Sequence, residues 1–149
     1  MSNLALTYQI QGRWAEAEAL QIQVLETRKI VLGANHPKTL ISIGNLVSTY
    51  QNQKQWTKAE ALQIQLLETC KTVLGAEHPD TLTTMANLAS TYWNQARWTE
   101  AEALQIQVLE TCKSMLGAEH SNTLISMANL ALTYWKQERW VDAEVLQVQ

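Results

Sequence analysis

The sequence is built on a 42-residue period, which constrains the fold more than any other feature. The stretch NLASTYWNQARWTEAEAL, residues 87–104, recurs with few changes from Asn3, Asn45 and Asn129. Equivalent starts at residues 1, 43, 85 and 127 define the repeats 1–42, 43–84 and 85–126 and a partial repeat, 127–149. A fixed period of about 20 to 50 residues is typical of solenoids, in which each unit buries its apolar face against its neighbours. We therefore expect one repeat domain over residues 1–149.

Each repeat predicts two helices joined by a short turn. In the third repeat Met85, Leu88 and Tyr92 recur at helical spacing and predict a first helix of about 15 residues. Pro37 and Pro79 suit the first turn of that helix in two of the repeats. The unit is therefore expected to be an αα-hairpin.

The second helix of each repeat is expected to span about 18 residues and to carry a broad apolar face, which suits a helix packed on two sides. In the third repeat Thr99 can cap this helix, and Glu102 completes a capping box that the second repeat also contains. Ala15 and Val141 interrupt the pattern in the outer repeats, so we expect those helix starts to fray. Gly117 follows the helix and supplies the left-handed residue on which helices often end.

Composition and charge exclude several classes of protein. The net charge is −3, and the 11 Lys and Arg residues are scattered rather than gathered in a basic stripe, so nucleic acid is not an expected partner. No apolar run approaches the roughly 18 to 20 residues of a membrane span, so we expect no membrane partner. The first residues do not resemble a signal peptide, so the expected location is cytoplasmic.

The histidines, cysteines and carboxylates of the chain do not form a catalytic or metal-binding pattern. His36, His78 and His120 recur once per repeat, which spaces them too widely for one metal ion, and we expect hydrogen bonding within their loops instead. Cys70 and Cys112 are also one repeat apart; stacked helices lie about 8–10 Å apart, beyond the reach of a disulfide. No phosphate-binding loop, nucleophile motif or carboxylate pair is visible, so we expect no enzyme activity, cofactor or metal.

The repeat resembles a known family. Leu88, Ala89 and Tyr92 on the first helix, Trp98 in the turn and the loop sequence LGAEH resemble the tetratricopeptide repeat in its kinesin-light-chain form. The repeats also resemble the arrays attached to fungal NOD-like receptor proteins. The resemblance implies an all-α fold, an α-solenoid of about three and a half stacked αα-hairpins in a right-handed superhelix, whose first helices line a concave peptide-binding face. HEAT or armadillo repeats are the structural alternative.

A set of mostly polar residues lies opposite the core side of each first helix, on the side that the resemblance makes concave. Asn45, Asn87 and Asn129 match the asparagine with which similar proteins grip a peptide backbone, because an amide offers both a donor and an acceptor. The alternative is that they are solvated residues copied by duplication. The candidate partner-binding residues on this face are Asn45, Ser48, Asn52, Asn87, Ser90, Asn94, Asn129 and Lys136.

Two tryptophans extend this candidate site. Trp93 and Trp135 replace the glutamines Gln9 and Gln51 of the earlier repeats. They are candidate aromatic anchors, because tryptophan is enriched at binding hot spots. Two other interpretations remain open: sequence drift on an exposed edge, and packing of Trp93 between neighbouring first helices.

The chain is therefore predicted to be a non-catalytic protein–protein interaction module within a larger receptor-like protein, with a protein or extended peptide as its partner. Ile41, Thr83 and Ile125 occupy positions where similar proteins that clamp a C-terminal carboxylate carry lysine, so such a clamp is not expected. Lys136 is the only basic residue of the face, which disfavours acidic cargo. The alternative is a self-assembling array, a homo-oligomer that associates through apolar, uncapped ends.

Overall fold

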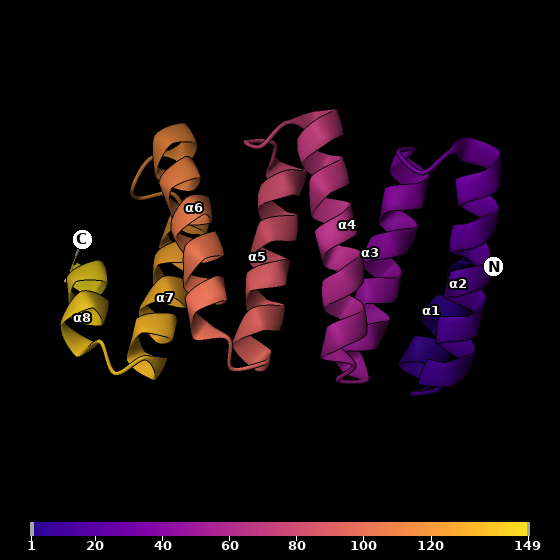
Figure 1. The fold of residues 1–149 in the computed structure, drawn as a ribbon, viewed down its shortest axis with the longest axis horizontal. Coiled ribbons are helices and arrows are strands. Elements are labelled where there is room, and N and C mark those ends of the chain that lie inside the picture. Colours follow the sequence, from indigo (N-terminus) through magenta and orange to yellow (C-terminus); the bar gives the residue numbers. More distant parts are fainter. Residues whose placement is uncertain (1, 149) are drawn as a thin grey trace. The chain divides into compact units, whose positions relative to one another are not determined.

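The structure, a computed structural model, describes residues 2–148, including all their side chains except those of residues 2, 3, 6, 147 and 148. These residues form eight α-helices and no strand. They divide into two compact units: unit 1 contains α1 to α4 and unit 2 contains α5 to α8 (Figure 1). The helices are α1 (Ser2–Ile10), α2 (Trp14–Leu32), α3 (Pro37–Asn52), α4 (Trp56–Leu74), α5 (Pro79–Asn94), α6 (Trp98–Leu116), α7 (Ser121–Lys136) and α8 (Trp140–Val148).

The expected αα-hairpins are confirmed, with first helices of 16 residues in α3, α5 and α7 and second helices of 19 residues in α2, α4 and α6. Each of these first helices begins after a histidine. The Nδ1 atoms of His36, His78 and His120 accept a hydrogen bond from the backbone N–H two residues later, at 3.1, 3.2 and 3.2 Å. Hydrogen bonding of the histidines within their own loops is thereby confirmed, and Pro37 and Pro79 occupy the first helical position as predicted.

The predicted capping box at the start of the second helix is wrong. Helix α6 begins at Trp98, so Thr99 lies inside it, and the capping position is held by Arg97, whose side chain makes no cap hydrogen bond. The turn before it is instead closed by backbone bonds to the first helix. Arg97 N–H donates to Tyr92 O at 2.9 Å, and Ala96 N–H donates to Trp93 O at 3.1 Å.

This pair of backbone bonds is a Schellman closure, which requires a residue with positive φ. Ala96 supplies it with φ of 58°, and the equivalent residues Gly12, Lys54 and Glu138 have φ of 72°, 58° and 61°. Helices α2 and α8 begin after the same turn, so Ala15 and Val141 do not remove a cap. At the other end of α6, Gly117 has φ of 91°, as predicted for the residue that ends the helix.

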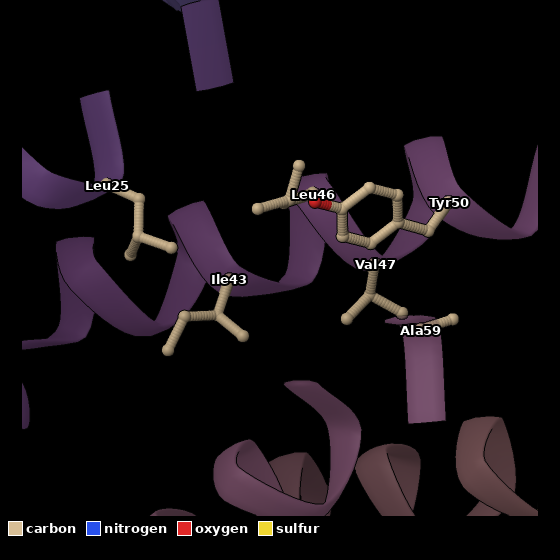
Figure 2. Packing of buried hydrophobic residues seen from close by; sticks show 6 residues of the cluster. All are labelled: Leu25, Ile43, Leu46, Val47, Tyr50 and Ala59. Carbon is tan, nitrogen blue, oxygen red and sulfur yellow. The ribbon is translucent and has the colours of Figure 1, made fainter. Parts of the chain in front are cut away.

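The apolar side chains pack between consecutive helices of each unit. In unit 1, α3 lies between α2 and α4, and the core residues that they share are Leu25, Ile43, Leu46, Val47, Tyr50 and Ala59 (Figure 2). In unit 2, Leu109 of α6 packs with Met127 and Leu130 of α7. Burying one such side chain stabilises the fold by about 1.5–3 kcal/mol, so neighbouring hairpins stabilise one another.

A buried hydrogen bond also joins a second helix to the next first helix in each unit. In unit 1 the Thr49 hydroxyl donates to Gln21 Oε1 at 2.7 Å and accepts from Gln9 Nε2 at 2.6 Å. In unit 2 the Thr133 hydroxyl donates to Gln105 Oε1 at 2.6 Å. Gln63 has the same repeat position and is buried, but its amide atoms have no hydrogen-bond partner among the described residues.

Candidate functional site

The candidate site is a groove on unit 2, where the first helices α5 and α7 stand on either side of α6. A hollow of about 310 Å³ lies between them, and Val108 and Cys112 of α6 form its buried floor. A second hollow, of about 240 Å³, shares Val108 and the residues Ala86, Ser126 and Asn129 with the first, so the two adjoin. We call this the α5–α7 groove; it is lined by Glu77, Pro79, Leu82, Thr83, Ala86, Asn87, Ser90, Trp93, Gln105, Val108, Cys112, Met115, Leu116, Asn122, Ile125, Ser126, Asn129 and Leu132.

Four of the predicted residues line this groove together: Asn87, Ser90, Trp93 and Asn129. Asn87 and Asn129 are exposed, and their side-chain amides have no hydrogen-bond partner among the described residues. Their backbone carbonyls accept bonds at 3.2 Å from the hydroxyls of the threonines one turn later. Both amides are therefore available to a ligand, one from each wall of the groove.

Asn94 is exposed but does not line the groove. Its Nδ2 atom donates to the carbonyl of Ser90, one turn earlier on the same helix, at 2.8 Å. In unit 1, Asn52 does the same with Ser48 O at 2.9 Å. These two amides are hydrogen-bonded to backbone carbonyls of their own helices, whereas the amides of Asn87 and Asn129 are unpaired.

Trp93 and Trp135, the two candidate aromatic anchors, and Lys136 lie near one end of the groove. Trp93 lines the groove and also packs edge-on against Trp98, with ring centroids 5.3 Å apart. Trp135 is 54% exposed and packs in the same way against Trp140, at 5.1 Å. Lys136 Nζ lies 5.8 Å from the Trp93 centroid and 5.9 Å from that of Trp135, within the range of cation–π attraction. Trp93 thus serves both as groove wall and as packing for its own hairpin.

Asn45, Ser48 and Asn52 of unit 1 are all exposed on α3, at the repeat positions of Asn87, Ser90 and Asn94. Their occurrence on one side of the helix agrees with the predicted pattern. Their role in binding, like that of the unit 2 residues, stays a prediction.

The apolar part of the groove could not be predicted from the sequence. Val108, Cys112 and Met115 belong to the second helix, whose broad apolar face predicts packing on two sides, and Ile125 stands where carboxylate-clamping relatives carry lysine. The signal for them was the broad apolar face of the second helix. One side of that face packs against neighbouring helices, and the other side opens into the groove.

The charged groups of unit 2 are concentrated outside the groove lining. Arg139 donates to Glu102 and to Asp142, each at 2.7 Å, and these two bonds raise the pKa of its guanidinium. Burial, followed by the negative charge of Glu102, raises the pKa of Tyr134. The only charged residue that lines the groove is Glu77.

The described part of the chain contains neither a metal-binding cluster nor a membrane-spanning helix. In residues 2–148 no group of three or more His, Cys, Asp or Glu side chains could hold a metal ion. Cys70 and Cys112 are free and buried, as expected. No helix in that range is long and apolar enough to cross a membrane.

Comparison with known proteins assigns the repeats. A family model described as tetratricopeptide repeat matches residues 1–38, 39–80, 81–122 and 123–149. A search of proteins with curated descriptions gives no match.

Three solved structures have a similar fold. The nearly identical TPR-like repeats of a kinesin light chain-like protein from Podosopora anserina are 31% identical; the TM-score is 0.85, and the match covers 97% of this chain and 69% of that one. A variant of the same protein gives 30% identity and a TM-score of 0.86, covering 97% and 68% of the two chains. BtubC (BKLC) from P. vanneervenii is 18% identical to this chain, with a TM-score of 0.86. The match covers 97% of this chain and 58% of that one.

These matches decide between the two repeat families that the sequence left open. The family matches that begin at residues 39, 81 and 123 recur with the period of the sequence, and the all-helical, solenoid-type fold is confirmed. Repeats of this kind are commonly scaffolds for protein interactions and are typically non-catalytic. The HEAT and armadillo alternative is excluded, and the chain belongs to the tetratricopeptide repeat family, with kinesin light chain-like repeats among its structural neighbours.

Proposed function

We propose that this chain is a non-catalytic interaction module that binds a protein or an extended peptide on the exposed side of its first helices, with the α5–α7 groove as its main contact. The observation that carries this proposal is the pair of exposed, unpaired amides of Asn87 and Asn129 on opposite walls of a groove with an apolar floor.

The chemistry of the groove suits an extended chain. Each residue of an extended peptide presents one backbone N–H and one C=O, and each asparagine amide can either donate to a C=O or accept from an N–H. Such a neutral hydrogen bond contributes about 0.5–1.5 kcal/mol net. Apolar side chains of the peptide can bury surface against Met115, Leu116 and Ile125, which line the groove and are exposed. Asparagine is a weaker helix former than alanine by up to about 0.7 kcal/mol, and neither amide offsets this with a bond inside the chain.

The test is a selection of peptides from a random twelve-residue phage library on the immobilised chain, followed by titration calorimetry with the selected peptides. Asn87→Ala and Asn129→Ala should each weaken binding about three- to tenfold, the loss of one hydrogen bond. Asn94→Ala is the matched control, because its amide is engaged with its own helix. Binding that tolerates both groove substitutions would refute the proposal.

Self-assembly is the second candidate, favoured by exposed apolar residues on α8. Trp140, Val141 and Val145 of that helix are all exposed. Sedimentation velocity over a wide concentration range tests this candidate: association that Val141→Asp and Val145→Asp abolish would support it, and a monomer throughout would refute it.

Two wider features are part of the proposal. The resemblance to fungal NOD-like receptor arrays suggests a receptor-like parent protein, and the sequence suggests a cytoplasmic location. Cell fractionation with an antibody to the chain tests both, because it reports the compartment and the length of the native polypeptide.

A further inference from the structure

The lining of the α5–α7 groove is nearly free of charge over its whole length. Glu77 lies at one end, beside Pro79 and the start of α5, and every other lining residue is apolar or a neutral polar residue. Lys136, beyond the opposite end, does not line the groove and lies over the rings of Trp93 and Trp135. A ligand in the middle of the groove therefore meets no counter-ion.

This lack of charge discriminates between ligands. A carboxylate or ammonium that entered the groove would lose hydration against its exposed apolar lining, chiefly Met115, Leu116 and Ile125, and no partner of opposite charge would replace the lost water. An apolar side chain in the same place gains from burial. The groove therefore disfavours charged side chains and favours apolar ones, and its specificity depends on the difference between the two binding free energies.

The length of the groove limits the segment that it holds. Along α5 it runs from Pro79 to Trp93, and at 1.5 Å per helical residue this is about 21 Å. An extended chain advances about 3.3 Å per residue, so the groove spans about six residues of a bound segment. Alternate side chains of an extended segment face the same way, so about three of the six side chains face the floor of the groove and determine which segments bind.

Resting on the proposed function, we infer that the α5–α7 groove selects an extended segment of about six residues with apolar side chains at alternate positions and no charged residue between its ends. The partner is thus an uncharged, apolar stretch of a protein rather than an acidic or a basic one.

The phage selection described above tests this inference through the composition of the selected peptides. Six-residue windows depleted of Asp, Glu, Lys and Arg, whose binding Asn87→Ala and Asn129→Ala weaken, support it. Selected windows enriched in charged residues, with the same dependence on the asparagines, overturn it while the proposed function stands. Selected peptides that bind independently of both asparagines overturn the inference and the proposed function together.

A charge placed in the groove provides a sharper test. Ile125 lines the groove and is 58% exposed, whereas its neighbour Leu124 is 51% exposed and does not line it, so both positions should accept lysine without loss of the fold. Ile125→Lys should weaken binding of an uncharged selected peptide about tenfold and strengthen binding of the same peptide carrying one glutamate by a similar factor. Leu124→Lys should change neither. Equal effects of the two substitutions overturn the inference.

The same variants distinguish a second copy of this chain from a separate partner. If the groove receives another copy, the free chain associates with itself and Ile125→Lys abolishes that association while Leu124→Lys does not. That result in sedimentation velocity overturns the inference. A state of association that both variants leave unchanged supports a separate partner.

Discussion

Replacing Ala96 with glycine should stabilise the protein, although it removes a side chain. Ala96 is the left-handed residue of the turn between α5 and α6, with φ of 58°. A residue with a Cβ pays about 1–2 kcal/mol for this conformation, and glycine pays none. The extra freedom of glycine in the unfolded chain offsets about 0.5–1 kcal/mol of that gain. The net gain is therefore about 0.5–1 kcal/mol.

The same argument applies at Lys54 and Glu138, with φ of 58° and 61°. The three turns are separate, so the effects should add, to about 2 kcal/mol for the triple glycine variant. In a chain of this size that corresponds to a rise in Tm of roughly 4–8 °C. The melting curves should be followed by circular dichroism and by calorimetry, because repeat arrays do not always unfold in a single step.

Two glycines provide controls of opposite sign. Gly12 is the equivalent residue of the first turn, with φ of 72°, and Gly12→Ala should lose about as much stability as Ala96→Gly gains. Gly117 has φ of 91° and ψ of 162°, a region that only glycine occupies readily, so Gly117→Ala should cost about 1–3 kcal/mol. A Cβ at either position would meet no atom within 4 Å, so the loss reports the backbone alone. A lower Tm for Ala96→Gly would refute the left-handed turn.

Three further predictions concern single side chains, each measured by urea unfolding. His120→Ala should cost about 1 kcal/mol because the ring caps α7, whereas His120→Asn should retain most of the stability. Thr133→Val should cost about 1–3 kcal/mol, because it leaves the buried Gln105 amide oxygen without a donor; in Gln105→Leu the same threonine change should cost less. Gln63→Leu should be neutral or stabilising, since that buried amide has no partner; a loss as large as that of Gln105→Leu would contradict this reasoning.

The hairpins could be predicted from the sequence because four repeats carry the same apolar spacing. Met85, Leu88 and Tyr92 place one side of α5 toward the core, and the glycines after α2, α4 and α6 mark where those helices end. The start of the second helix could not be placed in this way. It is determined by backbone bonds around Ala96, a residue that gives no signal for positive φ, and the nearby Thr99 suggested a cap that does not form.

The site was predicted in part for a related reason. Helical spacing alone places Asn87 and Asn129 on the exposed side of their helices, and the structure puts both on one groove. Helical spacing could not distinguish these two asparagines from Asn94. The Asn94 amide bonds to its own helix, and that bond depends on the side-chain conformation. Helical spacing also could not predict the buried hydrogen bond between Gln105 and Thr133, because that bond joins two different helices.

The central claim is that the unpaired amides of Asn87 and Asn129 bind a partner's backbone. The most direct measurement is titration calorimetry of one library-selected peptide against the parent chain, the double variant Asn87→Ala with Asn129→Ala, and the control Asn94→Ala. The account predicts about ten- to hundredfold weaker binding for the double variant, the loss of two hydrogen bonds, and unchanged binding for the control. Equal affinity for all three chains would contradict it.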